Sequence, residues 1–100
     1  MSPDQNTAPS PNGSAIASLD TEASLLGSLL LEPEVLISVA DKLEADDFSD
    51  PRHQQIYKSI SELFNSNQAI DLLTVSNQLR KEGLLEQTGG ASYLLSLIHI

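Results

Sequence analysis

The sequence predicts an all-α fold, a compact orthogonal bundle of about five or six short helices preceded by a disordered tail. From Leu19 onward, apolar residues recur at spacings of three and four, the period of helices with one buried face. No run of four or more residues alternates convincingly with the period of a β-strand. At 100 residues, the chain has room for one small domain.

Residues 1–18 form a distinct block rich in Pro, Ser and Asn, with almost no side chain large enough to bury. Such a segment cannot offset the entropy lost on ordering. We therefore expect a disordered tail over residues 1–18 and a helical domain over residues 19–100.

The first helix begins where the tail ends. Its apolar stripe consists of Leu19, Ala23, Leu26 and Leu30, widened by Leu25 and Leu29. Asp20 and Thr21 are candidate caps, and the charge of Glu22 suits the positive end of the helix dipole. Gly27 within this helix costs about 1 kcal/mol relative to Ala. Close approach of another helix over Gly27 is favoured over simple tolerance of the glycine.

The second and third helices are separated by an acidic connection. Pro33 breaks the first pattern and suits the first turn of the second helix. The stripe of the second helix consists of Val35, Leu36, Val39, Ala40 and Leu43. This helix is expected to end in the acidic residues 44–47, after which Phe48 fills the core from a loop.

Asp50 and Pro51 mark the start of the third helix, with a capping Asp followed by Pro at the first helical position. Its stripe consists of His53, Ile56, Tyr57, Ile60, Leu63 and Phe64, and residues 65–67 end it. Asp71 is expected to cap a fourth helix, which Gly83 ends by adopting a positive φ. The stripe of the fourth helix consists of Leu72, Val75, Ser76 and Leu79.

A turn at residues 88–90 leads to a fifth helix containing Ala91, Tyr93, Leu94, Leu97 and Ile98. Taken together, the stripes predict one aliphatic core. Its expected members are Leu26, Leu30, Val39, Leu43, Phe48, Ile56, Ile60, Phe64, Leu72, Val75 and Leu79.

The net charge of −9 bears on the class of partner. Nucleic-acid binding draws most of its affinity from cations that neutralise phosphate. The chain has five Lys and Arg residues, none before Lys42, and among them only Arg80 and Lys81 are adjacent. Direct binding of nucleic acid or of anionic membranes is therefore not expected. A basic protein partner fits the charge, as does an acidic surface that serves only solubility.

Several other classes lack support. The chain has no cysteine for disulfides or thiolate metal sites, and its first residues do not resemble a secretory signal. The longest leucine-rich stretch, residues 25–31, is far too short to span a bilayer. The chain is expected to be cytoplasmic. It contains neither the phosphate-binding pattern G-x-x-x-x-G-K-[ST] nor the G-x-S-x-G turn of a nucleophilic serine.

A metal site is one hypothesis for the acidic connection, because His53 lies near Asp46, Asp47 and Asp50 in the sequence. The spacing favours a different interpretation, in which Asp50 caps a helix and His53 is a half-buried, hydrogen-bonded residue of the apolar stripe. We expect no catalytic, cofactor-binding or metal-binding residue in the chain.

Four segments, in order, resemble the N-terminal domain of DnaB-type replicative DNA helicases. EASLLGSLL at residues 22–30 is similar to the family's opening helix, and DF followed by HQQIY at residues 47–57 is similar to its second element. IDLLTV at residues 70–75 and GGASYL at residues 89–94 resemble the next two. Matching positions that look architectural rather than catalytic are Gly27, Phe48, His53, Asp71, Gly89, Gly90 and Tyr93.

The resemblance implies the head of a hexameric helicase, whose N-terminal domains form a collar that docks primase. Its implied partners are other helicase subunits, primase and a helicase loader. The family's ATP and Mg²⁺ sites lie in a motor domain that this chain lacks. The alternative is an unrelated acidic helical adaptor or DNA mimic.

The chain stops before the long helical hairpin through which family members pair. It is therefore expected to be a fragment or a truncated gene product, mostly monomeric in dilute solution. Its apolar end suggests an interaction face formed by Tyr93, Leu94, Leu97 and Ile98.

Overall fold

Helices make up most of the computed structural model, which describes residues 18–98; this range contains no strand. The α-helices are α1 (Leu19–Leu31), α2 (Val35–Val39), α3 (Pro51–Asn65), α4 (Leu72–Lys81) and α5 (Gly90–Ile98), and η2 (Ala45–Asp47) is a 3₁₀ helix. The predicted all-α class, with about five or six short helices, is confirmed. Apart from Ser18, the expected disordered tail lies outside the described residues.

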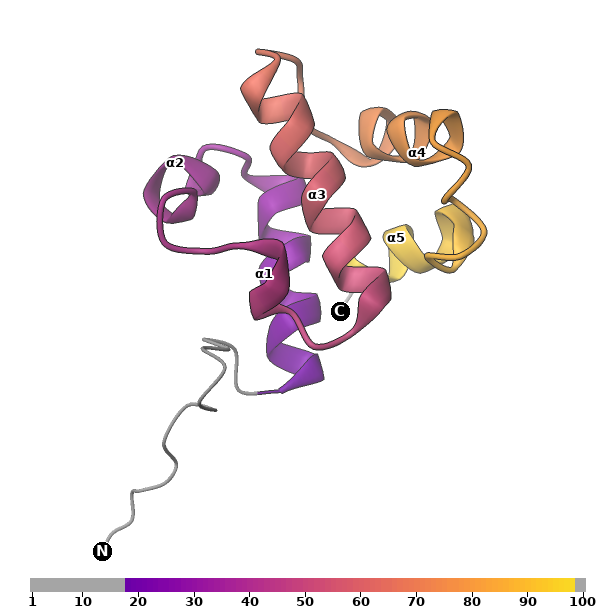
Figure 1. Ribbon diagram of the computed structural model, residues 1–100, viewed down its shortest axis with the longest axis horizontal. Helices are drawn as coiled ribbons and strands as arrows, with labels where there is room; N and C mark the ends of the chain where they lie inside the picture. Colours follow the sequence, from indigo (N-terminus) through magenta and orange to yellow (C-terminus); the bar gives the residue numbers. More distant parts are fainter. Residues whose placement is uncertain (1–17, 99–100) are drawn as a thin grey trace, which may run out of the picture.

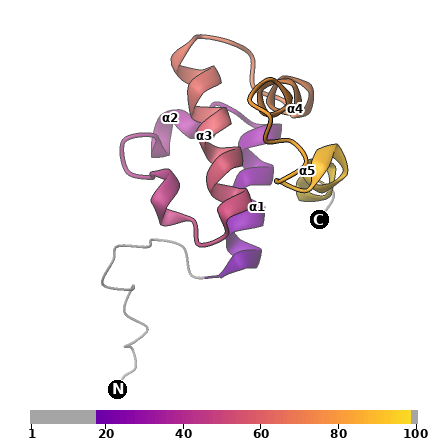
Figure 2. The same cartoon turned by 45° about the vertical axis from the view of Figure 1, so that its right-hand side comes forward.

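Helices α1 and α3 form the centre of the bundle (Figure 1). Helix α1 packs against α5, α3 and α2, and α3 packs against α4 and η2. Both views place α2 on one side of the central pair and α4 with α5 on the other (Figure 2). The domain thus has two different sides. Helix α2 contributes to the surface on one side of the central pair, and α4 and α5 contribute to the surface on the other.

Helix α1 begins one residue earlier than its expected caps. Ser18 is the N-cap, and its Oγ accepts a hydrogen bond of 3.1 Å from the backbone N–H of Thr21. The expectation of a cap at Asp20 or Thr21 was wrong, because both residues lie inside the first turn. Ser18 therefore belongs to the helix start rather than to the tail.

Helix α2 is shorter than predicted, ending at Val39 rather than in the acidic residues 44–47. The amide of Leu43 still donates to the carbonyl of Val39, so one turn continues beyond the helix. The carbonyl of Leu43 instead accepts the hydroxyl of Tyr57 at 2.8 Å, and Glu44 is extended. This tertiary hydrogen bond helps to turn the chain away from the helix path.

Helices α3 and α4 begin as the sequence predicts. The Asp50 side chain accepts the backbone N–H of Arg52, and Pro51 occupies the first turn of α3. Asp71 accepts the Thr74 N–H at 2.9 Å, while the Thr74 hydroxyl oxygen accepts the Asp71 N–H at 2.9 Å. This reciprocal pair is a capping box.

Helix α4 ends at the glycine that the sequence indicates. Gly83 has a φ of 75°, its amide donates to Arg80 and the amide of Leu84 donates to Leu79. These two hydrogen bonds are those of a Schellman motif. The predicted stop at Gly83 is confirmed.

Removing the α4 cap should have a moderate effect. Replacing Asp71 with alanine leaves N-terminal amides of α4 without their side-chain acceptor and should lower the free energy of unfolding by about 1 kcal/mol. Asp71→Ser, which retains a capping oxygen, should lose only a few tenths of that figure. Urea denaturation of the three proteins measures the difference; equal losses in both variants would contradict the role of the cap.

The core is aliphatic and includes residues from every α-helix. Of the predicted members, Leu26, Leu30, Leu43, Phe48, Ile56, Ile60, Val75 and Leu79 are buried. Val39, Phe64 and Leu72 are only half-buried and pack against the core from its edge, which corrects the expected list. The core also contains Leu29, Leu36, Tyr57, Leu63, Ile70, Leu94 and Leu97.

Candidate functional site

Three polar side chains from three helices form one hydrogen-bonded chain inside the bundle. The Nδ1 atom of His53 lies 2.7 Å from Oε1 of Glu22, and its Nε2 atom lies 2.6 Å from the hydroxyl of Tyr93. Glu22 is in the first turn of α1, His53 in the first turn of α3 and Tyr93 in the first turn of α5. We call Glu22, His53 and Tyr93 the clamp, because they join segments far apart in the sequence.

Glu22 also binds the loop that leads into α3. Its Oε2 accepts the backbone N–H of Ser49 at 2.7 Å and the Ser49 hydroxyl at 2.6 Å. Its Oε1 accepts the backbone N–H of Asp50 at 3.4 Å. With an exposed fraction of 1%, this carboxylate depends on protein donors rather than on bulk water.

The environment of the clamp sets its protonation. Burial disfavours the charged form of Glu22, but hydrogen bonds from Ser49, His53 and the Asp50 amide outweigh it and hold its pKa below 4.5. Burial raises the pKa of Tyr93 above 10.0. The phenol is therefore protonated at neutral pH and can donate to Nε2 of His53 in the tautomer whose Nδ1–H donates to the Glu22 carboxylate.

The order carboxylate, imidazole, hydroxyl is also that of catalytic triads. A nucleophile in such a triad is activated by an adjacent base or by a lowered pKa. In the clamp, the pKa of the Tyr93 hydroxyl is raised, which opposes formation of a phenolate. The arrangement is suited to holding three helices together rather than to nucleophilic chemistry.

Arg52 and Asp50 cover the outer side of the clamp. The Cζ atom of Arg52 lies 4.2 Å from the centroid of the Tyr93 ring, close enough for a cation–π contact. The Nη2 atom of Arg52 lies 2.8 Å from Oδ2 of Asp50. Hydrogen bonding from Arg52 lowers the pKa of Asp50 below 3.8. These contacts keep Asp50 charged while its carboxylate also caps α3.

Stability should depend on acid pH through Glu22. Because its folded-state pKa lies below 4.5, the unfolded chain binds more protons as the pH falls. The Glu22 carboxylate therefore contributes its full stabilisation above about pH 4.5. This contribution is lost as the pH falls through the lower pKa that Glu22 has in the folded state. Urea denaturation should show the stability difference between the parent and Glu22→Gln narrowing as the pH falls below about 4.5. A constant difference across this range would contradict the effect.

An aromatic cluster anchors the segment before α3. The ring of Phe48, 1% exposed, lies 5.1 Å from that of Tyr57 and meets the His53 ring edge-on at 6.4 Å. The Gln54 side chain donates to the Phe48 carbonyl at 2.7 Å. The expected filling of the core by Phe48 from a loop is present in the structure.

Helices α1 and α5 approach each other closely at Gly27. A Cβ atom added there would collide with the carbonyl oxygen of Leu97 and lie 3.1 Å from its carbonyl carbon. Both obstructing atoms are backbone, so they cannot move aside by a change of rotamer. The close helix approach favoured from the sequence is present, and α5 is the helix that makes it.

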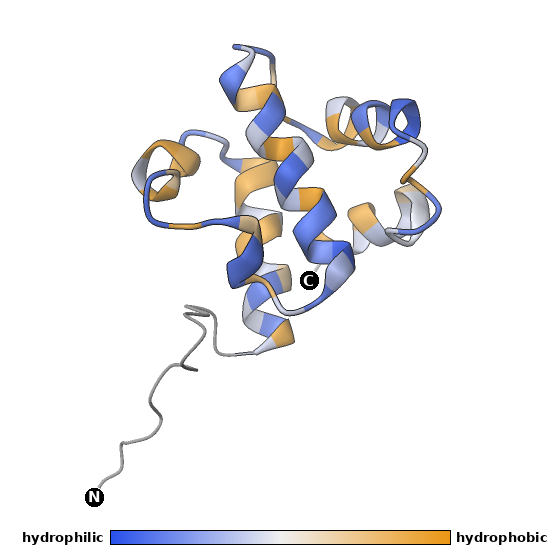
Figure 3. Ribbon diagram, in the orientation of Figure 1, coloured by the Kyte–Doolittle hydropathy of each residue, from blue (hydrophilic) through white to orange (hydrophobic). Residues whose placement is uncertain are grey.

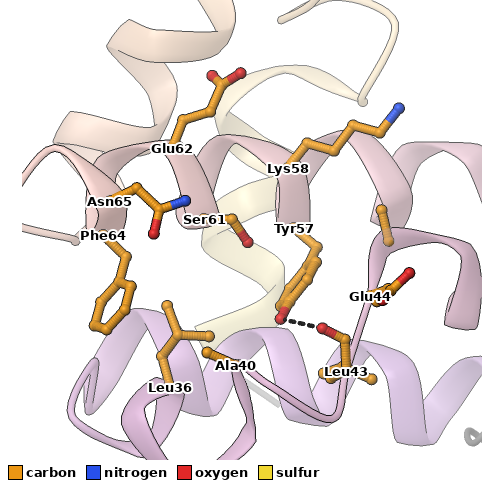
Figure 4. Close-up of a pocket in the computed structure, with 11 residues that line it drawn as sticks. Leu36, Ala40, Leu43, Glu44, Tyr57, Lys58, Ser61, Glu62, Phe64 and Asn65 are labelled. Atoms are coloured by element: carbon orange, nitrogen blue, oxygen red, sulfur yellow. Dashed lines mark hydrogen bonds between the residues drawn. The ribbon is translucent and has the colours of Figure 1, made fainter.

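A pocket of 370 Å³ opens on the other side of the bundle, between α2, the segment after it and α3. Figure 4 shows Leu36, Ala40 and Phe64 facing this opening, with Tyr57 hydrogen-bonded to Leu43 at one end. Lys58, Ser61 and Glu62 lie along the α3 edge. The pocket is thus apolar inside and charged at its rim.

The expected interaction face at the chain's end needs correction. Leu94 and Leu97 are buried in the core, with exposed fractions of 0% and 4%, because they pack between α5 and the rest of the bundle. Tyr93 and Ile98 are half-buried. Gly89, in the turn before α5, and Gly90, the first residue of α5, have φ values of 97° and 76°. The apolar stripe of α5 thus contacts this chain's own core.

Three of the four residues of the metal hypothesis, His53, Asp47 and Asp50, have other partners. Both ring nitrogens of His53 are engaged by the clamp, and Asp50 pairs with Arg52. Asp47 accepts the backbone N–H of Glu44 at 2.8 Å. Within residues 18–98, no group of three His, Cys, Asp or Glu side chains is arranged to hold a metal ion.

Sequence reasoning missed Glu22 as a buried residue and Ser49 as its partner. One signal was present, since Glu22 lies four residues before Leu26 and eight before Leu30, on the same helix face. A carboxylate on an apolar stripe requires internal donors. No pattern in the sequence indicated Ser49, because its contact with Glu22 spans 27 residues.

None of the helices in the described part of the chain combines the length and apolar character needed to cross a bilayer.

A family model described as the DnaB-like helicase N-terminal domain matches residues 14–100. The replicative DNA helicase DnaB of Rhodothermus marinus is 42% identical over 79 residues, covering 79% of this chain and 8% of that protein. The corresponding helicase of Mycobacterium leprae (strain TN) is 39% identical over 80 residues, covering 80% of this chain and 13% of its own length.

A solved structure of the same domain family also matches this chain. The crystal structure of the N-terminal domain of DnaB helicase from Mycobacterium tuberculosis matches with a TM-score of 0.79 and 38% sequence identity, covering 82% of this chain and 57% of that chain. The chain spans only a small part of the length of its curated relatives, 8% of the first and 17% of another from Bacillus subtilis (strain 168). The clamp joins three of the four segments whose resemblance pointed to this family, and the chain belongs to the DnaB-like helicase N-terminal domain family.

Proposed function

We propose that this chain is a non-catalytic assembly and docking domain of a replicative helicase, with other helicase subunits, primase and a helicase loader as its partners. The observation that carries the proposal is that the side chains best suited to acid–base chemistry join helices inside the domain. Glu22, His53 and Tyr93 hydrogen-bond to one another between helices. The domain is therefore expected to act by binding other proteins through its surface.

The share of the relatives that this chain covers supports a role without a motor. This chain corresponds to 8% of the length of one replicative helicase and 13% of the length of another. The sequence also lacks the phosphate-binding pattern G-x-x-x-x-G-K-[ST]. ATP and Mg²⁺ would belong to the motor region of such a helicase, outside this chain.

Charge favours proteins over nucleic acid as partners. With a net charge of −9 and five Lys and Arg residues, the chain cannot neutralise many phosphates. A basic protein surface is a better electrostatic match. Family membership overturns the alternative of an unrelated acidic adaptor.

Two measurements test this proposal. The purified chain should hydrolyse ATP no faster than a buffer control; hydrolysis above that level would contradict it. Titration of the ¹⁵N-labelled chain with the C-terminal domain of a bacterial primase should shift a contiguous set of surface amides. If primase, other helicase subunits and a helicase loader all leave the spectrum unchanged, the docking role is wrong.

A further inference from the structure

The pocket of Figure 4 shares part of its lining with a second pocket. This second pocket, of 670 Å³, borders it, and both are lined by Phe64 and Asn65. The first pocket reaches toward Leu43, and the second reaches toward Pro33 and Ile70. We call the two together the α2–α3 groove, because α2 and the second half of α3 form its walls.

The groove presents apolar surface at several depths. Leu36 and Tyr57 are buried at its base, and Phe64 is half-buried along its wall. Ile37 stands on its rim with an exposed fraction of 67%. Exposed apolar side chains that line a concave surface are typical of protein-binding sites.

The rim of the groove is mainly acidic. Glu34, Glu44 and Glu62 line it, against one cation, Lys58. Figure 3 shows hydrophobic colour over α2 and hydrophilic colour in the segment that follows it. The Glu62 carboxylate also accepts a hydrogen bond of 2.9 Å from the Gln78 side chain of α4, and the neighbouring Glu82 carboxyl raises the pKa of Glu62.

The apolar groove beside α4 lacks this charge imbalance. It has a volume of 430 Å³ and is lined by one acid, Asp71, and one base, Arg80. Leu73 there is 68% exposed, almost the same as Ile37. The α2–α3 groove is therefore distinguished by its charge rather than by its exposed apolar side chains.

The dimensions of the α2–α3 groove fit a short helix. Its α3 wall runs from Tyr57 to Asn65, about 13 Å at 1.5 Å per residue. A partner helix of about two to three turns matches this length, with apolar residues spaced three and four apart. Basic residues on its flanks would face the acidic rim.

We infer that the α2–α3 groove docks a basic amphipathic helix of another protein. This inference rests on the proposed docking function and names the surface and the chemistry of the partner. Apolar anchors fill the space between Leu36 and Phe64, and flanking Lys or Arg residues pair with the glutamates of the rim.

A peptide tests the groove directly. The probe is a fluorescein-labelled 16-residue helical peptide with leucines on one face and lysines elsewhere, measured by anisotropy in about 150 mM salt. Ile37→Lys should weaken binding about tenfold, because an apolar contact is lost and a like charge is added. Leu73→Lys, with the same charge change at equal exposure, should leave it nearly unchanged.

Two controls separate docking from general attraction between opposite charges. A peptide of the same composition but scrambled order should bind more weakly than the amphipathic one. Ala40→Arg, at an exposed position inside the groove, should reproduce the loss seen with Ile37→Lys. Circular dichroism verifies that the variants fold. Equal effects of Ile37→Lys and Leu73→Lys, or equal binding of the two peptides, would overturn the inference.

A titration with the C-terminal domain of primase separates this inference from the proposed function. Amide shifts concentrated at α2 and the second half of α3 support both. Shifts confined to other surfaces overturn the groove and leave the docking function standing. Specific peptide binding without any primase shift supports the groove and removes primase as its partner. A dimer that Ile37→Lys dissociates, in sedimentation without peptide, would assign the groove to a second copy and overturn the inference.

Discussion

Replacing Glu22 with alanine should lower the free energy of unfolding by about 3–5 kcal/mol, because a buried carboxylate is removed while the donors that it satisfied remain, at about 1–3 kcal/mol for each buried donor left without a partner. The substitution leaves the Ser49 amide and hydroxyl and the His53 ring without their acceptor. A domain of about 80 ordered residues has a total stability of about 4–12 kcal/mol. Loss of this one carboxylate should therefore consume a large part of it.

Asp20 provides the matched control for Glu22. Both are acids in the first turn of α1, but Asp20 is exposed. If Glu22 acted only through the helix dipole, Asp20→Ala and Glu22→Ala would have similar effects, each below about 1 kcal/mol. Urea denaturation of both variants distinguishes the two explanations, and equal losses would contradict the clamp.

Glu22→Gln keeps the prediction testable if the alanine variant does not fold. The glutamine keeps the shape and one acceptor oxygen, and His53 can change tautomer to accept its amide. Stability should lie between those of the parent and the alanine variant. A double-mutant cycle with His53→Ala should give a coupling energy of about 0.5–3 kcal/mol between the two positions. Additive losses would show that the two side chains do not act together.

Helix boundaries set by local chemistry could be predicted from the sequence. Asp50 with Pro51, Asp71 with Thr74 and Gly83 each act through hydrogen bonds that span only a few residues. Such contacts are favoured by the local order of residues and need no distant segment. Local patterns were therefore sufficient to predict the start of α3 and both ends of α4.

Boundaries set by distant residues were predicted poorly. Helix α2 was expected to reach Leu43, but the Tyr57 hydroxyl binds the Leu43 carbonyl from 14 residues away. The clamp depends on the same kind of contact, because His53 meets residues 31 and 40 positions away. Periodicity places each of these side chains on a helix face but does not say which faces meet.

The error at α5 has the same origin. An apolar stripe requires a covering surface, and the sequence does not state whether that surface belongs to the same chain. Leu94 and Leu97 are covered by this chain, whereas Ile37, 67% exposed, remains open. Gly27 was the one local signal for the covering helix, since a glycine inside a leucine-rich helix indicates close approach of another backbone.

Gly27→Val should be the second most damaging substitution, lowering the free energy of unfolding by about 3 kcal/mol. Overpacking a core costs about 1–3 kcal/mol, and here the new Cβ meets the backbone of Leu97 rather than a movable side chain. Separating α1 from α5 also exposes part of Leu94 and Leu97, each worth about 1.5–3 kcal/mol when fully buried. Valine's higher helix propensity offsets only a few tenths of a kcal/mol.

Ser28→Val is the matched control, because Ser28 is the next residue of the same helix and is exposed. Its effect should stay within about 0.5 kcal/mol. Native-state hydrogen exchange locates the damage: in Gly27→Val, amides of α5 should lose more protection than those of α4, because the new side chain collides with the backbone of α5. If Gly27→Val is as stable as Ser28→Val and the amides of α5 stay protected, the prediction is contradicted. The close packing of α1 against α5 would then not require a glycine at position 27.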